Sequence, residues 1–159
     1  MLSPVRVAPD GEGAPMTTTR LGAAGTPLHL WLVGVLTLLF NTMGIISYTT
    51  TELGMLADMG MTPAQIAFME GYPAWAIAFW ALGVWGAFAG SVLLLLRSRW
   101  AVAAMMVALT GLAVMTLYNH VLIELPADMK SPALDIAIWA VTLFLLFYAR
   151  RMAVAGVLR

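Results

Sequence analysis

The chain has 159 residues, of which 62% are hydrophobic and 10% charged, and its acidic and basic side chains are equal in number. A soluble domain is typically about 45–50% apolar and about 25% charged, so the composition excludes an ordinary water-soluble globular protein. The absence of cysteine excludes disulfide frameworks, thiolate metal sites and thiol redox chemistry.

Residues 1–26 are rich in Pro, Gly, Ala and Thr and show no apolar periodicity, which predicts a disordered tail. The tail lacks the short apolar core and the cleavage site of a signal peptide. Met16, followed by Thr-Thr-Thr-Arg, is an alternative start of translation. In either case we expect the first apolar segment to act as an uncleaved signal anchor.

Four apolar segments follow, each long enough to cross a bilayer as a helix. They cover about residues 27–50, 73–96, 100–123 and 132–150. We therefore expect a transmembrane domain over residues 27–151 and a cytoplasmic tail at 152–159. Thr62, Pro63 and Gln65 fit a capping box, which predicts a short helix at about 63–70, outside the bilayer or in its interface. The expected fold class is an all-α membrane protein with four transmembrane helices.

The charges are distributed unevenly along the chain. The charged residues in the connections after the first and third spans are mainly acidic, and the two connections together contain one basic residue. Seven of the eight cationic residues lie before the first span, between the second and third, and after the fourth: Arg6, Arg20, Arg97, Arg99, Arg150, Arg151 and Arg159. The positive-inside rule then places both termini in the cytoplasm.

Two stretches of the sequence resemble each other. Residues 73–81 (PAWAIAFWA) and 132–140 (PALDIAIWA) share proline, alanines, isoleucine and tryptophan, and the preceding spans share a weaker match, TLLFN (37–41) with MTLYN (115–119). The pattern predicts two helical hairpins repeated in the same direction through the membrane. Chance matching between alanine-rich spans is the alternative.

Small residues recur on one face of the second span, within about a third of the helix circumference. This stripe comprises Ala76, Gly83, Gly86, Ala87 and Gly90. Such small-xxx-small spacing lets another backbone approach closely, so we interpret the stripe as a helix-packing face. The wall of a ligand groove is the alternative.

A candidate ligand site is suggested by polar and aromatic residues of the spans, most of them toward the outer half: Asn41, Trp80, Asn119, Asp135 and Trp139. Trp80 and Trp139 are repeat-equivalent and would offer flat faces to a sugar ring or another planar ligand. The competing interpretation is structural. The tryptophans then fill space, the asparagines form interhelical hydrogen bonds, and Asp135 complements the positive end of its helix.

His120 and Glu124 share a helix face, as metal ligands often do, but with two histidines in the chain a water-facing pair is the favoured interpretation. No metal, cofactor or nucleic-acid partner is expected. No span carries a charge near its midpoint, and no phosphate-binding loop or nucleophile elbow occurs. We therefore expect no enzymatic activity.

Residues 39–49 (LFNTMGIISYT), 61–73 (MTPAQIAFMEGYP) and 71–102 resemble a group of small, uncharacterised bacterial inner-membrane proteins. Some members of this group are labelled sugar transporters. The resemblance covers about residues 28–150 and implies four spans in a bacterial inner membrane. It brings no catalytic residues.

Two functions follow as hypotheses. The first is a non-enzymatic scaffold or accessory subunit that packs through small-residue helix faces, in a homo-oligomer or with a membrane protein partner. The second is a transporter or channel for a small solute such as a sugar, which would act as an oligomer because four helices are few for alternating access. In both, the lipid bilayer is the surrounding partner.

Overall fold

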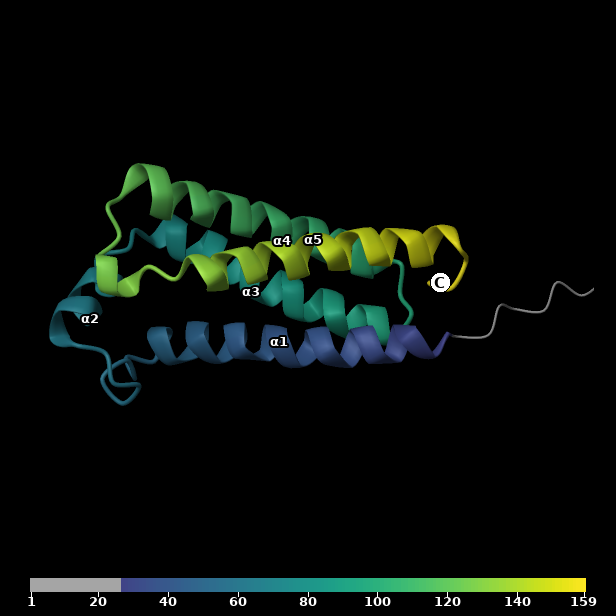
Figure 1. The fold of residues 1–159 in the computed structure, drawn as a ribbon, viewed down its shortest axis with the longest axis horizontal. Helices are drawn as coiled ribbons and strands as arrows, with labels where there is room; N and C mark the ends of the chain where they lie inside the picture. The colour runs from purple at the N-terminus through teal and green to yellow at the C-terminus, as the bar shows by residue number, and fades with distance from the viewer. Residues whose placement is uncertain (1–26) are drawn as a thin grey trace, which may run out of the picture.

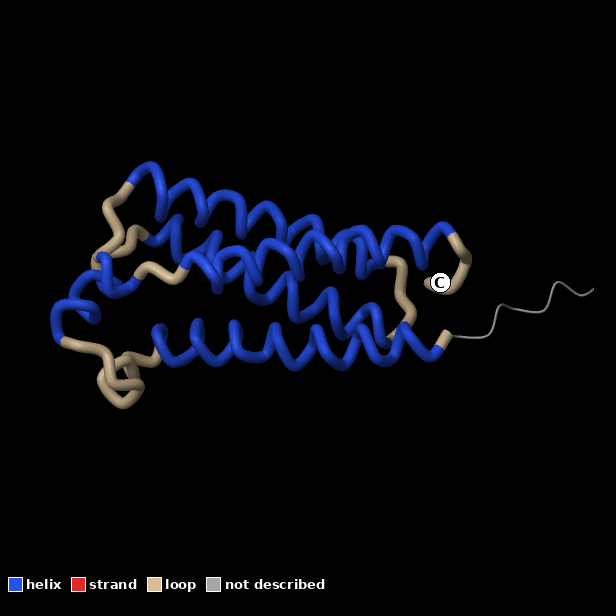
Figure 2. The backbone as a smooth tube through the Cα atoms, in the orientation of Figure 1, coloured by secondary structure: helices blue, strands red, loops and turns tan. Residues whose placement is uncertain are grey.

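In the computed structural model, which describes residues 27–159, four long helices lie side by side and no strand occurs among the described residues (Figures 1 and 2). The long helices are α1 (Leu28–Glu52), α3 (Ala74–Leu95), α4 (Trp100–Leu117) and α5 (Pro132–Val154). A π-helical turn, Tyr118–Leu122, continues α4, and a 3-10 turn, Ala127–Met129, precedes α5. All four helices are long and apolar enough to cross a membrane, so the predicted fold class is confirmed. The predicted tail at 1–26 lies outside the described residues.

The predicted short helix is present as α2 (Pro63–Glu70). Its capping box is complete, because the Gln65 backbone N–H donates to the Thr62 hydroxyl at 3.3 Å and the Thr62 N–H donates to the Gln65 side-chain oxygen at 2.9 Å. The Gln65 amide also donates to the Asp128 carboxylate at 2.8 Å. This bond joins α2 to the connection between α4 and α5.

The helices alternate in direction, which separates the charges of the described residues. The connections at 53–73 and 123–131 lie at one end of the bundle, here called the acidic end (Figure 1). The turn at 96–99 and the C-terminal residues lie at the other end, here called the basic end. The described arginines are all at the basic end, in that turn or at 150–159. The segregation predicted from the sequence is therefore a feature of the fold.

The α3–α4 interface is the most extensive in the bundle. A Cβ atom placed on Gly86 would lie 2.9 Å from the Ala108 backbone nitrogen, and one placed on Gly111 would collide with the backbone of Gly83 and Phe79. Real Cβ atoms do not approach a backbone so closely, so glycine is required on both sides. Glycine thus lets the two helix backbones approach each other closely.

Helices α1 and α5 occupy the outer positions of the bundle. Helix α1 packs on α3, and α5 packs mainly on α4. Both leave large apolar side chains exposed, among them Leu36, Leu39 and Phe147. Hydrocarbon is the solvent that such surfaces require, which makes the chain a multi-pass membrane protein in contact with lipid.

The C-terminal residues differ from the expected tail at 152–159. Helix α5 continues to Val154, past the expected end near residue 150, and the chain then folds back onto the bundle. Val157 and Leu158 are buried, and the Arg159 N–H donates to the Arg97 carbonyl at 2.7 Å. The physical reason is apolar burial, because these side chains join the hydrophobic cluster at the basic end.

The internal repeat stays a prediction. If one two-fold axis related the two hairpins, α5 would pack on α1 as α3 packs on α4. Instead, α1 and α5 share few contacts, and His29 and Tyr148 hydrogen-bond between them near the basic end. Any duplication has therefore diverged in how its hairpins associate.

Candidate functional site

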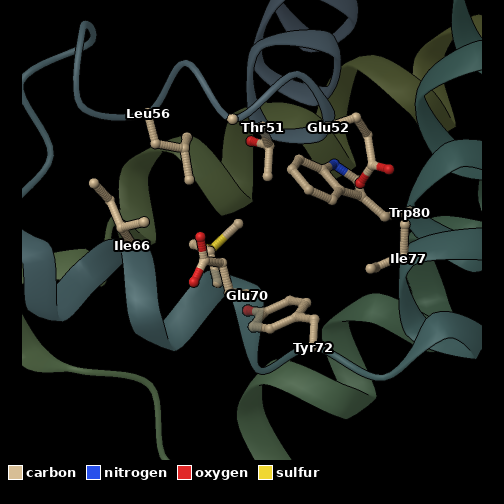
Figure 3. A pocket seen from close by; sticks show the side chains of 10 residues that line it. Thr51, Glu52, Leu56, Ile66, Glu70, Tyr72, Ile77 and Trp80 are labelled. Atoms are coloured by element: carbon tan, nitrogen blue, oxygen red, sulfur yellow. The ribbon is translucent and has the colours of Figure 1, made fainter.

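Two cavities open at the acidic end of the bundle. The first lies between the end of α1, helix α2 and the start of α3, and has a volume of about 150 Å³ (Figure 3). The second lies between the end of α4 and the start of α5, and has a volume of about 490 Å³. Apart from Trp80, which lies about two turns into α3, the residues that line the cavities lie near helix ends or in the adjoining connections, so both cavities are shallow in the bundle.

The first cavity combines carboxylates with apolar and aromatic walls. Its lining residues are Thr51, Glu52, Gly54, Leu56, Ile66, Met69, Glu70, Tyr72, Ile77 and Trp80. Glu52 ends α1 and Glu70 ends α2, so the two carboxylates reach the cavity from different helices (Figure 3). None of the lining residues is basic.

Two aromatic rings of this cavity are held by neighbours outside it. Trp80 packs edge-on against Tyr48 of α1, with ring centroids 5.2 Å apart. The Tyr72 hydroxyl donates to the Asn119 side-chain oxygen at 2.9 Å, and its ring packs edge-on against Tyr118. Burial, with a smaller contribution from Tyr118, raises the pKa of Tyr72 to about 12, so this phenol stays protonated at neutral pH.

The second cavity is lined by polar side chains of both signs together with apolar residues. The polar members are Asn119, His120, Glu124, Lys130 and Asp135. The His120 Nε2 atom lies 3.5 Å from a carboxylate oxygen of Asp135, while its Nδ1 atom contacts the Thr116 carbonyl at 3.1 Å. The His120–Asp135 pair therefore links the π-helical turn to α5.

A metal site is not assembled here. His120 and Glu124, the pair with metal-ligand spacing, both line the second cavity. Among the described residues, no three His, Cys, Asp or Glu side chains gather closely enough to hold an ion. His120 is paired with Asp135 instead.

The structure distributes the five predicted ligand residues over four places. Asn119 and Asp135 line the second cavity, and Trp80 lines the first. Asn41 and Trp139 line neither of them. Trp80 and Trp139 therefore do not share either cavity, because the two indoles pack against different helices, α1 and α4.

Asn41 and Trp139 form interhelical hydrogen bonds. The Asn41 amide is buried and donates to the Ala87 carbonyl at 3.1 Å and to the Ser91 hydroxyl at 2.9 Å. The Trp139 indole donates to the Thr116 hydroxyl at 3.0 Å. These bonds join α1 to α3 and α4 to α5. For Asn41 this is the structural role weighed from the sequence, whereas Trp139 was expected only to fill space in that interpretation.

The predicted small-residue stripe lies inside the bundle. Gly83 and Gly86 approach the backbone of α4, and Gly90 accommodates the Met105 side chain. Ala76 and Ala87 are also buried, and the Ala87 carbonyl accepts the bond from Asn41. The stripe is therefore occupied within a single chain, chiefly by α4.

Sequence reasoning missed several partners of these residues. Gly111, Ser91 and Thr116 complete the contacts of the stripe, of Asn41 and of Trp139. A signal for Gly111 was present, since small residues recur on one face of α4 at 101, 104, 108 and 111. Glu70 carried no such signal, because its place in the first cavity depends on how α2 folds against the bundle.

The arrangement defines a class, namely a four-helix, multi-pass membrane protein with two cavities at its acidic end. No known protein family, no curated protein and no solved structure was found to match the chain.

Proposed function

We propose that this protein is a non-enzymatic scaffold or accessory subunit of the bacterial inner membrane, with both termini in the cytoplasm. The observation that carries the proposal is the apolar cluster that fills the bundle from its basic end toward its middle. Leu94 of α3, Met105 of α4 and Leu145 of α5 are each about 1% exposed and belong to one apolar cluster. A conduit through a single chain would have to open this cluster.

The polar groups support the same proposal. No buried side-chain nitrogen or oxygen among the described residues lacks a hydrogen-bond partner. A transport pathway typically places polar groups where they await a solute or an ion. Here the side-chain nitrogen of Asn41, a buried residue of α1, donates to two acceptors on α3. The polar interior thus contributes to cohesion of the bundle.

A partner would have to meet the protein outside the glycine stripe. Since α4 covers that stripe, a partner would have to use apolar side chains that are exposed elsewhere, such as Leu36 on α1 and Phe147 on α5. These faces would contact a second copy or another membrane protein in place of lipid. The charged residues at the basic end, such as Arg150, support a cytoplasmic location of that end.

The association is tested by photo-crosslinking from single positions in the native membrane. A photoreactive side chain at Leu36 or at Phe147 should yield an adduct of discrete mass from at least one of the two. The matched control at Leu145, which is buried, should yield none. If neither exposed position gives a discrete adduct, the scaffold proposal fails.

The alternative proposal is a small-solute transporter that acts as an oligomer. It is supported by the second cavity, where Asn119 and Asp135 offer hydrogen-bonding groups of the kind that a sugar requires. Uptake of labelled sugars into vesicles that contain the purified protein tests it. Saturable uptake above that of protein-free vesicles would favour the transporter, and uptake at the protein-free level would favour the scaffold.

A further inference from the structure

The carboxylates of the first cavity have no basic partner among residues 27–159. Figure 3 shows Glu52 beside Trp80 on one side and Glu70 beside Tyr72 on another, with both carboxylates near the open space. Among the described residues, the ion pair within 4.0 Å is that of His120 with Asp135, in the other cavity. The first cavity therefore presents two exposed carboxylates, one from α1 and one from α2, that no basic residue of the described part of the chain neutralises.

The remaining walls disfavour a bare metal ion as a ligand of this cavity. Leu56, Ile66, Met69 and Ile77 supply apolar surface, and Leu56 is buried although it lies in a connection. Calcium prefers six to eight oxygen ligands, and magnesium prefers an octahedron of oxygens. An apolar wall cannot supply such ligands.

An organic ammonium ion satisfies both parts of the lining. Its charge is complementary to Glu52 and Glu70, and its methyl or methylene groups fit apolar surface and the faces of aromatic rings, here Trp80 and Tyr72. A volume of about 150 Å³ is of the size that holds one benzene-sized molecule. This limits the ligand to a compact cation.

The cavity is also held in shape before any ligand arrives. Tyr48 fixes the Trp80 ring through its edge-on contact, and the Asn119 side-chain oxygen accepts a hydrogen bond from the Tyr72 hydroxyl. The capping box and the Gln65–Asp128 bond hold α2, which carries Glu70 at its end. Less ordering entropy is then lost on binding.

We propose that the cavity between α1, α2 and α3 binds a small organic ammonium ion through Glu52, Glu70 and the rings of Trp80 and Tyr72. The site opens at the acidic end, so it would meet solutes on the side opposite the arginines. This inference goes beyond the proposed function and does not depend on it. A scaffold and a transporter would each expose the same site.

The test is calorimetric titration of the full-length protein in nanodiscs with choline and with its neutral carbon isostere, 3,3-dimethylbutan-1-ol. The two probes share shape but differ in charge. We expect choline to bind at least about tenfold more tightly than the isostere, because the carboxylates and the rings act on the charge. This comparison needs no substitution, so no folding defect can obscure it.

Variants then locate the site. Glu52→Gln and Glu70→Gln should each weaken choline binding about tenfold. Asp58→Asn is the control, because Asp58 lies in the connection between α1 and α2 but does not line the cavity, and it should leave choline binding unchanged. Absence of choline binding would overturn the proposal, and so would equal binding of the isostere. Loss of binding in Glu124→Gln, with Glu52→Gln and Glu70→Gln unaffected, would assign the cation to the second cavity and also overturn it.

Discussion

At the scale of single residues, glycine and asparagine contribute to the bundle in different ways. Gly86 and Gly111 permit close packing because they have no side chain, and a side chain on either would meet the facing backbone. Asn41 contributes hydrogen bonds, because its one amide donates to both a carbonyl and a hydroxyl of α3. Both kinds of contact substitute for the hydrophobic driving force that helices lose inside lipid.

A methyl group added to Gly86 should weaken the α3–α4 interface. Gly86→Ala places its Cβ against the Ala108 backbone, and overpacking of this kind costs about 1–3 kcal/mol. Gly44→Ala is the matched control, because its Cβ would meet Val84 side-chain carbons at an ordinary 3.7 Å. Thermal unfolding in detergent should show a lower midpoint for Gly86→Ala alone. Equal midpoints for the two variants would contradict the close approach.

Tyr72 should make stability depend on alkaline pH. Its pKa is about 12 in the folded protein against an ordinary value of 10.0, so the unfolded chain loses this proton first. The contribution of Tyr72 to stability is complete below about pH 10 and is lost as the pH rises from about 10 to about 12. Unfolding monitored by circular dichroism across this range should show a steeper decline for the natural protein than for Tyr72→Phe. An identical decline would contradict the assignment.

At the scale of helices, pairs are joined by a few specific bonds placed among apolar contacts. The capping box of α2 and its bond to Asp128 hold one connection of the acidic end against the other. The bond from Trp139 to Thr116 joins α5 to α4, which form a less extensive interface than α3 and α4 do. The outer helix α5 should therefore depend more on single polar contacts.

Removal of the Thr116 hydroxyl tests this dependence. Thr116→Val leaves the Trp139 indole without its acceptor and should cost about 0.6–2 kcal/mol, the range for interhelical hydrogen bonds in membranes. Thr110→Val is the control, because the Thr110 hydroxyl bonds within its own helix, to the Met106 carbonyl. The two variants are compared by thermal unfolding in detergent. A shift of the same size in both would show that the Trp139 bond is not the cause.

At the scale of the whole molecule, the alternation of helices separates acidic from basic connections. If the basic end is cytoplasmic, then both cavities face the opposite side of the membrane. The chain has no cysteine, so an introduced cysteine supplies the one thiol in the protein that a labelling reagent can modify.

Single thiols at the two ends should report the orientation. Ser131→Cys at the acidic end should react with a membrane-impermeant maleimide in intact spheroplasts, while Ala155→Cys at the basic end should react only after permeabilisation. Both positions are exposed in the fold, so access to the reagent is the difference between them. The reverse pattern would contradict cytoplasmic termini.

Much of the fold was predictable because hydropathy, proline and capping signals are local. The four spans and α2 follow from such signals, and the observed bounds lie close to the predicted ones for all but the end of α5. Pairing of helices was not predictable in the same way. Trp80 and Trp139 match in sequence yet contact different helices, since the choice of partner depends on how whole faces fit together.

The first cavity was not predicted either, because it also depends on how the helices pair. Glu52 and Glu70 end two different helices, and no spacing in the sequence brings them together. The stripe on α3 was recognisable from its spacing. The surface that packs against it was not, because small residues can face lipid, a second copy or α4. In the fold, α4 takes that place.

Water accessibility along the bundle tests whether the apolar cluster that extends from the basic end toward the middle closes the protein to water. Single cysteines in a reconstituted bilayer are challenged with a water-soluble thiol reagent. Asp135→Cys lines the second cavity and should react, whereas Met105→Cys and Leu145→Cys, at positions about 1% exposed, should stay unmodified. Rapid modification at either buried position would show a water-filled path through the bundle and would contradict the account.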